Sequence, residues 1–99
     1  MIVWDEKKRI ANLEKHGLDF AASHLVYDSP DKLTITAVRN NEARSMDIAL
    51  IEYLGMVLAL IYVQRGDDIR AISLRRASRK ERKLYEEACR QDGLGKGKA

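Results

Sequence analysis

The sequence predicts a single α+β domain, with helices at both ends and an antiparallel sheet of about four strands between them. Apolar residues recur at helical spacing near each end of the chain, and each of these segments begins with a capping residue. Residues 33–76 instead hold strand-like segments separated by short turns, which favours an antiparallel meander. The 99 residues, 45% hydrophobic and 33% charged, are typical of one globular domain. We expect this domain to span residues 1–90, and residues 91–99 to form a disordered tail of glycine and lysine.

The N-terminal region is expected to form a short edge strand and then a helix. Residues 2–4 are apolar and give the strand. Asp5 follows as an N-cap, and Ile10 and Leu13 supply the apolar stripe of the helix. Gly17 is a typical stop for a helix of this length.

A second helix and the strands follow. Asp19 can cap the second helix, and the turn residues 29–31 end it. The strands are predicted at 33–38, around 46–50, at 56–63 and at 69–75. Segment 56–63 is apolar on both faces, so it should be the central strand.

The last helix should begin at a capping box. Ser78 and Glu81 have the spacing of that motif, and Leu84 and Ala88 form the expected inner stripe. On the strand before it, alternation places Ser73 and Arg75 on one face, with Ile72 and Leu74 on the core face.

Positive charge is concentrated at this junction of strand and helix. Residues 70–83 contain seven basic residues and one acidic residue, whereas residues 1–69 carry more acidic than basic groups. The overall net charge of +3 therefore comes from one patch. Such a patch is expected to contact a phosphate-rich partner, most simply a nucleic acid, although a solvated helix face would have the same composition.

Several classes of protein are excluded or disfavoured. Cys89 is the only cysteine, which rules out an internal disulfide and fits a reducing cytoplasm, where we expect the protein. The longest apolar run has eight residues, too few to span a membrane, and the first residues do not resemble a signal peptide. We find no zinc motif, phosphate-binding glycine loop, Ser-His-Asp set or acidic cluster for two magnesium ions. No cofactor or metal is therefore expected.

Two blocks of residues resemble the BrnT family of bacterial toxin–antitoxin ribonucleases, which are related in fold to the RelE toxins. The first block is similar to the family's opening motif and consists of Trp4-Asp5-Glu6-Lys7, Asn12, Lys15-His16-Gly17 and Phe20. The second is similar to its closing motif and consists of Tyr62, Arg65-Gly66, Ile69-Arg70, Ile72-Ser73, Arg75, Ala77, Glu81 and Tyr85. The family's Arg-Lys pair is Arg75-Arg76 here, which keeps the charge.

The resemblance implies a RelE-like fold and cleavage of RNA that inhibits translation. It also implies neutralisation by a BrnA-type antitoxin, a ribbon-helix-helix protein that dimerises and binds the promoter of its own operon. We expect a heterotetramer built on the antitoxin dimer, in which BrnA covers part of the basic patch with acidic and apolar surface. Operator DNA should be contacted only through the antitoxin.

Metal-free cleavage of RNA is possible because the ribose 2′-OH can act as the nucleophile. The site must remove its proton, stabilise the charge on the phosphorane and protonate the leaving 5′-oxygen. Guanidinium groups suit the second task, because they stay charged and meet phosphate oxygens with two hydrogen bonds. We expect Arg75, with Arg65 across the hairpin, to do this. The residues expected to hold the RNA backbone are Arg70, Arg76, Arg79 and Lys80.

Three further side chains are candidates for the chemistry. Glu81 can act as the general base, and Tyr85, one turn later, as a proton donor or a platform for base stacking. His16 lies at a helix C-terminus, where the dipole favours the protonated imidazole of an acid donor. Each has a structural alternative: Glu81 as a capping residue or a partner of Arg75, Tyr85 as packing, and His16 as helix termination. The charge of neighbouring arginines should also lower the pKa of Glu81 and weaken it as a base.

Two other functions remain open. A non-catalytic module that binds RNA or a protein partner would keep the same basic patch. A toxin that cleaves mRNA only on the ribosome would leave most of the positioning to the ribosome. Cleavage of bulk RNA in EDTA without ribosomes would distinguish a free ribonuclease from these two alternatives.

Overall fold

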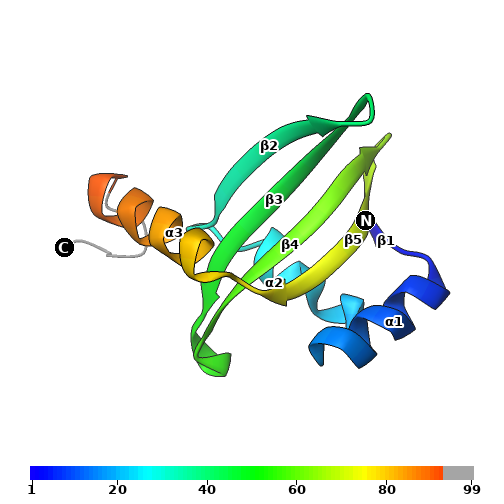
Figure 1. Cartoon of the computed structure of the whole chain (residues 1–99), viewed down its shortest axis with the longest axis horizontal. Helices are drawn as coiled ribbons and strands as arrows, with labels where there is room; N and C mark the ends of the chain where they lie inside the picture. Colours follow the sequence, from blue (N-terminus) through cyan, green and yellow to red (C-terminus); the bar gives the residue numbers. More distant parts are fainter. Residues whose placement is uncertain (93–99) are drawn as a thin grey trace.

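The computed structural model describes residues 1–92 and has an α+β fold built on one five-stranded sheet (Figure 1). Along the sheet the strands follow the order β1-β5-β4-β3-β2. Their bounds are Ile2–Val3 (β1), Leu33–Arg39 (β2), Glu42–Ile51 (β3), Met56–Arg65 (β4) and Asp68–Arg76 (β5). The helices are α1 (Glu6–His16), α2 (Ser23–Tyr27) and α3 (Arg79–Asp92), with short 3-10 helices η1 (Phe20–Ala22) and η2 (Glu52–Leu54). The predicted α+β class is confirmed.

The sheet is mixed, which corrects the purely antiparallel arrangement. Strands β2 to β5 form the predicted meander, with β4 in its centre. Strand β1, however, joins the outer edge of β5 in parallel and raises the count to five. A parallel neighbour needs a long connection, and the whole chain between β1 and β5 provides it.

Two element boundaries also differ from the prediction. The expected second helix is divided into the single turn η1 and the short helix α2. Helix α3 includes Gln91 and Asp92, which the sequence placed in the tail. The rest of the predicted tail, residues 93–99, lies outside the described residues.

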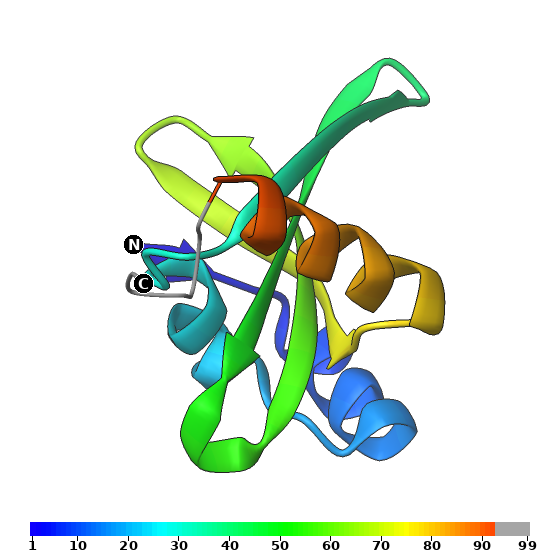
Figure 2. The same ribbon diagram turned by 90° about the vertical axis from the view of Figure 1, so that its left-hand side faces the viewer.

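The hydrophobic core lies between the sheet and the N-terminal elements. Phe20 and Val26, from η1 and α2, are fully buried against side chains of β3, β4 and β5. Trp4 packs edge-on against Phe20, with ring centroids 6.4 Å apart, and anchors the start of the chain. Helix α3 crosses the opposite side of the sheet (Figure 2). The buried cluster of this core accordingly contains no described residue of α3.

Local sequence signals for caps and turns operate as expected. The Asp5 carboxylate accepts hydrogen bonds from the N–H groups of Lys7 and Lys8, which starts α1. Gly17 ends α1 with φ of 72°, a left-handed conformation that favours glycine. Between β2 and β3, Asn40 and Asn41 both have positive φ, as a tight two-residue hairpin requires.

A β-bulge changes which residues of β5 face the core. Ser73 pairs with Ile61 and Ala71 pairs with Tyr62, so Ile72 has no partner on β4. Ala71 and Leu74 are consequently both buried, while Ile72 is only half-buried. The prediction of a core position for Ile72 was wrong, because it assumed strict alternation along the strand.

In α1 and α3, the side of the helix that is buried differs from the side that the spacing of apolar residues predicted. Ile10 and Leu13 of α1 are 45% and 39% exposed, and the buried residue of this helix is Asn12. On α3, Leu84 is 40% exposed and Tyr85 takes the buried position. A hydrogen bond between Asn12 and Leu74 orients α1. Another, between Glu81 and Arg75, orients α3. A pattern of apolar residues cannot predict such polar contacts.

A buried carboxylate joins β2, β3 and β4. Asp47 is fully buried and accepts hydrogen bonds from Lys32 Nζ at 2.8 Å, Thr34 Oγ1 at 2.6 Å and the Tyr62 hydroxyl at 3.1 Å. Lys32 also donates to the carbonyl of Tyr27 and lies over its ring. The charge of Asp47 is therefore matched by one cation and two hydroxyl donors.

Candidate functional site

Helix α1 is fixed alongside the open half of β5 by one side chain (Figure 1). Strand β1 pairs β5 only as far as Arg70, which leaves the outer edge of the following residues unpaired. Asn12 takes the place of a strand there: its amide nitrogen donates to the Leu74 carbonyl at 2.8 Å, and its oxygen accepts from the Leu74 N–H at 3.1 Å. The same amide nitrogen donates to the carbonyl of Leu18. The C-terminal end of α1 is thereby held beside the end of β5.

At that end, Arg75 and Glu81 form a bidentate ion pair. Arg75 Nη1 and Nη2 donate to the two carboxylate oxygens of Glu81 at 2.7 and 3.0 Å. Glu81 Oε1 also accepts from the Ser78 N–H, and the Ser78 hydroxyl accepts from the Glu81 N–H. The predicted capping box is confirmed, and the same carboxylate fixes the guanidinium.

The ion pair sets the protonation of both groups. The hydrogen bonds from Arg75, with help from Ser78, lower the pKa of Glu81 to about 2. The hydrogen bond with Glu81 in turn raises the pKa of Arg75. Glu81 is thus ionised at neutral pH and is a weak proton acceptor, in the direction that the sequence predicted.

His16 lies at the same corner, at the C-terminal end of α1. Burial lowers the pKa of His16 below its ordinary value, and the positive charges of Lys15 and Arg75 lower it further. The imidazole is therefore mainly neutral at pH 7, which favours a base over an acid. This direction is opposite to the one that the helix dipole predicted, because burial and two neighbouring cations disfavour the protonated imidazole.

The structure therefore brings together three of the five residues predicted for the chemistry. His16 comes from α1, Arg75 from β5 and Glu81 from the first turn of α3. A cavity of about 220 Å³ between α1 and β5 is lined by His16 and Ser73 among others, and neither Arg75 nor Glu81 lines it. Chemically, this corner offers a neutral imidazole and a fixed guanidinium.

Arg65 lies at the other end of the sheet. It ends β4 at the β4–β5 turn, where it donates to Glu42 at 3.2 Å. Arg75 pairs instead with Ala59, six residues before Arg65 on β4, which separates the two arginines by about 20 Å along the strand. They cannot hold the same phosphate, so the expected joint action of Arg65 and Arg75 does not fit this geometry.

The residues predicted to hold RNA are spread over two faces of the sheet. Arg70 pairs with Val63 on β4 and is half-buried. Arg76 follows Arg75 and so points to the opposite face, where its Nε lies 3.5 Å from Met56 Sδ. Arg79 and Lys80 are exposed in the first turn of α3, next to the Arg75–Glu81 pair.

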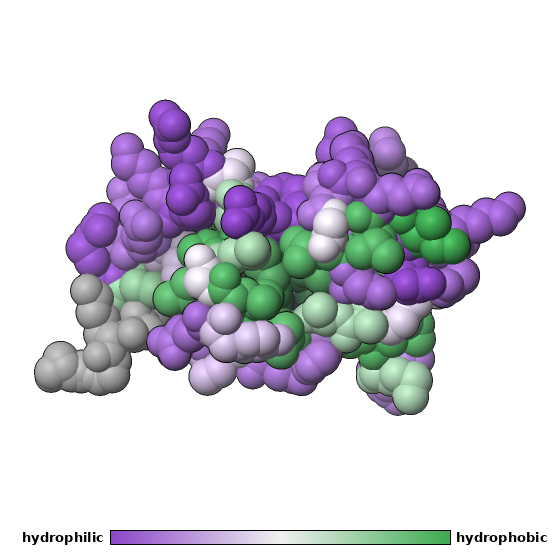
Figure 3. Space-filling model, turned by 90° about the horizontal axis from the view of Figure 1, so that it is seen from below, coloured by the Kyte–Doolittle hydropathy of each residue, from purple (hydrophilic) through white to green (hydrophobic). Residues whose placement is uncertain are grey.

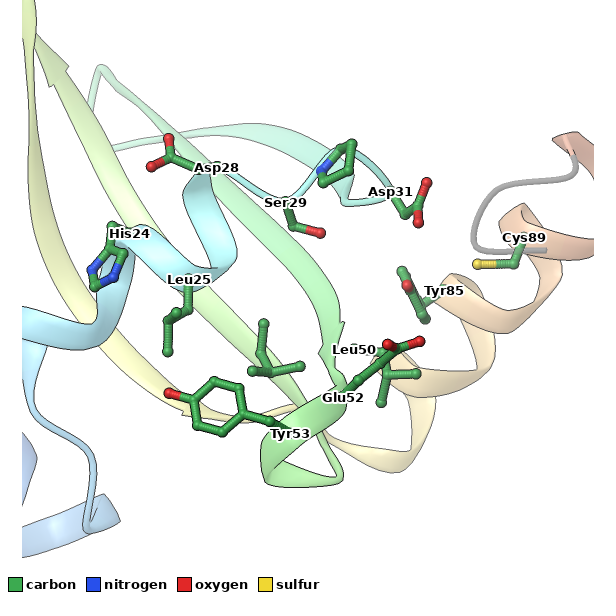
Figure 4. Close-up of a pocket in the computed structure, with 12 residues that line it drawn as sticks. His24, Leu25, Asp28, Ser29, Asp31, Leu50, Glu52, Tyr53, Tyr85 and Cys89 are labelled. Atoms are coloured by element: carbon green, nitrogen blue, oxygen red, sulfur yellow. The ribbon is translucent and has the colours of Figure 1, made fainter. Parts of the chain in front are cut away.

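Tyr85 lies in a different place, a groove at the end of β3. This groove, of about 820 Å³, lies where α2 and α3 approach the end of β3. Figure 4 shows Tyr85 and Cys89 reaching into it from α3, toward the segment that holds Asp31. Burial raises the pKa of the Tyr85 phenol, and only 7% of the residue is exposed. The groove has carboxylates on its rim, from Asp28, Asp31 and Glu52, and does not suit a phosphate.

Asn12 is the residue of this site whose role the sequence did not reveal. It was visible only as part of the motif shared with the BrnT family. Asn12 shares its side of the helix with Lys8 and Ala11, so this side has no apolar stripe that would predict a buried position. The open edge of β5 to which Asn12 binds forms only in the tertiary structure. Lys8 and Lys15, on the same side of α1, were missed for the same reason.

A comparison with protein families identifies the chain. The model of the ribonuclease toxin BrnT, of type II toxin–antitoxin systems, matches residues 4–81. The chain belongs to the BrnT family. The match includes His16, Arg75 and Glu81 and ends before Tyr85 and Cys89. Membership implies a ribonuclease toxin whose partner is a protein antitoxin. A search of curated proteins finds no match.

Two searches of the described residues concern other functions. Within residues 1–92, no three His, Cys, Asp or Glu side chains stand close enough to hold a metal ion together. In the same part of the chain, no helix has the length and apolar character needed to cross a membrane.

Proposed function

We propose that this BrnT-family protein is a metal-independent endoribonuclease that cleaves RNA through the ribose 2′-OH. The observation that carries the proposal is the neutral imidazole of His16 beside the guanidinium of Arg75, which Glu81 holds in place. A base and a fixed cation are the two groups that attack by a 2′-OH on its own phosphate requires.

The reaction divides between these side chains. His16 accepts the 2′-OH proton as the 2′-oxygen attacks phosphorus, and Arg75 stabilises the negative charge of the phosphorane. The bond to the 5′-oxygen then breaks, and that oxygen takes a proton from solvent. The products are a 2′,3′-cyclic phosphate and a 5′-OH. Glu81 is ionised and bound to Arg75, so we assign it the positioning of the guanidinium and not the general base.

The basic patch provides contacts to the RNA backbone in this proposal. Arg70 precedes Arg75 on β5, Arg79 and Lys80 lie between Arg75 and Glu81 in sequence, and each of the three can neutralise a phosphate. Arg65 can reach only a more distant phosphate, and Arg76 lies on the opposite face. Tyr85 is assigned no part in the chemistry, because its ring is buried in the acidic groove.

We further propose that the fold is RelE-like and that cleavage inhibits translation until a BrnA-type ribbon-helix-helix antitoxin binds. A toxin kept inactive by a protein needs apolar surface for that partner. Such surface is present on the outer sides of two helices, in Ile10, Leu13 and Leu84. Figure 3, which views the molecule from below, shows apolar side chains gathered across the middle of one face among charged ones. We expect a heterotetramer in which only the antitoxin contacts operator DNA.

Incubation of the purified protein with bulk RNA in EDTA tests the proposal. Cleavage to fragments with 2′,3′-cyclic phosphate ends is expected, and Arg75→Ala should lose on the order of 100-fold in rate. Arg39→Ala removes the same charge at the distant β2–β3 hairpin and should keep full activity. RNA that is retarded in a gel but remains intact would contradict the enzymatic reading.

One observation favours a second candidate, a toxin that acts only on the ribosome. Both Arg65 and Arg75 are paired with carboxylates of the same chain, so neither guanidinium is free before RNA arrives. A ribosome that positions the mRNA could compensate for this. Cleavage that appears only when ribosomes are added would establish this candidate, whereas RNA binding without cleavage in both conditions would indicate a non-catalytic module.

A further inference from the structure

We propose that the cavity between α1 and β5 is a binding subsite for the two RNA phosphates next to the scissile one, held by Lys15 and Lys8. The inference rests on the proposed ribonuclease function and extends the site along the outer side of β5. Neither lysine belongs to the basic patch of residues 70–83 from which the charge argument began.

The cavity is formed by one side of α1 and the bulged part of β5. Its lining from α1 is Lys8, Ala11, Asn12, Lys15 and His16, and its lining from β5 is Ile72 and Ser73. Residues at helix spacings of three, four and seven share one side of a helix, so Lys8 and Lys15 stand about 10 Å apart along its axis. Asn12 lies between them and fixes this side of the helix to Leu74.

The bulge in β5 supplies the other wall. Because Ile72 has no partner on β4, Ile72 and Ser73 line the cavity instead of continuing the core pattern. Ile72 gives an apolar contact that suits the carbon atoms of a ribose, and the Ser73 hydroxyl can donate to a phosphate oxygen. A groove with cations on one wall and a hydroxyl on the other matches a sugar-phosphate backbone.

The charge of the cavity is positive and is not neutralised from within. No carboxylate lines it, and among the described residues neither Lys8 nor Lys15 forms an ion pair. The neighbouring Arg9 differs, because Glu6 and Asp19 both bind it. The charges of Lys15 and Arg75 also lower the pKa of His16, which places a positive field over the cavity and the proposed base.

The subsite is continuous with the proposed cleavage site. His16 lines the cavity, and the charge of Arg75 contributes to lowering the pKa of its imidazole. An RNA strand with its scissile phosphate at Arg75 would therefore pass along α1. Lys15 would then contact the nearer phosphate and Lys8 the farther one. Their contribution is to binding and not to the chemical step.

Binding of a fluorescent 2′-O-methyl RNA, which lacks the nucleophile and cannot be cleaved, tests the subsite. Lys8→Ala and Lys15→Ala should each weaken binding several-fold and reduce the slope of log affinity against log salt by about 0.7. Lys7→Ala is the matched control: it removes the same charge from the adjacent position, outside the cavity, and should change neither quantity. In cleavage assays at pH 8, where His16 is neutral with or without the charge of Lys15, the two cavity variants should raise KM and leave kcat unchanged.

The outcomes separate the subsite from the mechanism. If Lys8→Ala and Lys15→Ala bind the RNA as Lys7→Ala does, the subsite is refuted, even where His16 and Arg75 prove essential for cleavage. If both weaken binding while His16→Gln cleaves normally, the subsite holds and the proposed base is wrong. A fall in kcat with an unchanged KM for the lysine variants would also overturn the assignment. All three lysines are exposed, and circular dichroism checks that each variant is folded.

Discussion

The carboxylate of Glu81 serves two structural functions at once. It closes the capping box that begins α3, and it holds both terminal nitrogens of Arg75. The start of the helix and the position of the guanidinium therefore depend on the same side chain. Substitution of Glu81 should affect the ion pair and the capping box together, whereas substitution of Arg75 removes the cation and the ion pair but leaves the capping box in place.

The ion pair predicts a dependence of stability on acid. The pKa of Glu81 is about 2 in the folded protein and near 4.5 when unperturbed, so the folded state favours the ionised form. Its contribution is complete above pH 4.5 and is lost as the pH falls toward 2. Glu81→Gln should therefore lower the free energy of unfolding by about 2 kcal/mol at pH 7 and by much less at pH 3.

Urea denaturation at the two pH values measures this difference. Glu86→Gln is the matched control, because Glu86 is exposed on the same helix and forms no ion pair within the described residues. An equal loss of stability at pH 7 and pH 3 would show that the Arg75–Glu81 pair does not stabilise the folded chain.

The lowered pKa of His16 predicts a loss in acid of a second quantity, the rate of cleavage. Because the pKa of His16 is below its ordinary value of 6.5, the base is available at pH 7 and is protonated only in more acidic solution. The rate should therefore fall only at a pH below 6.5, and His16→Gln should lower kcat by on the order of 100-fold and abolish that acidic limb. His24→Gln, on the exposed side of α2, is the control. An acidic limb that persists in His16→Gln would assign it to another group.

At the scale of elements, two polar side chains join secondary-structure elements that backbone hydrogen bonds usually join. Asn12 closes the open edge of β5, and Asp47 joins three strands through Lys32, Thr34 and Tyr62. Both side chains are buried, and the Leu74 backbone that Asn12 binds has no access to replacement water. Loss of either side chain should therefore cost more than an exposed hydrogen bond would.

Asn12→Ala is expected to lower the free energy of unfolding by about 2 kcal/mol, because the Leu74 N–H and carbonyl lose their partners. It should also release α1 from β5 and reduce activity through His16. Gln64→Ala removes a side chain that likewise donates to two carbonyls, but on an exposed hairpin, and should cost far less. Thermal unfolding compares the two variants. Equal effects would mean that Asn12 does not secure the strand edge.

Asp47→Ala should be more destabilising, by about 3 to 5 kcal/mol, because Lys32 is left without its carboxylate in a largely enclosed site. Thr34→Val removes only one neutral donor from the same carboxylate and should cost about 1 kcal/mol. Chemical denaturation gives both values. A loss in Asp47→Ala no larger than that in Thr34→Val would show that the ionic contact contributes nothing.

The sequence predicted what local rules determine, and it failed where tertiary contacts decide. The caps at Asp5 and Ser78, the central strand β4 and the meander were all readable from spacing and turn chemistry. The bulge at Ile72 and the parallel pairing of β1 were not, because neither has a local sequence signal. For the site, residue types indicated the chemistry, but only the structure separated Arg65 from Arg75.

At the scale of the whole molecule, charge is divided along the sheet. Residues 70–83 carry most of the positive charge, while the groove near α2 has a rim of carboxylates. An RNA strand should therefore be attracted to the side formed by β5 and the start of α3 and repelled from the groove. The groove and the exposed apolar residues of α1 and α3 remain for protein contacts.

This division predicts how RNA affinity depends on salt. Arg79 and Lys80 are exposed in the first turn of α3, where the helix dipole adds to their attraction for phosphate. Replacement of both by alanine should weaken binding of a 2′-O-methyl RNA similarly for all sequences and lower the slope of log affinity against log salt by about 1.4. Arg39→Ala combined with Lys7→Ala removes the same charge from other surfaces and should leave the slope nearly unchanged. Fluorescence anisotropy between 50 and 200 mM salt gives both slopes, and equal reductions would mean that RNA responds to net charge and not to the patch.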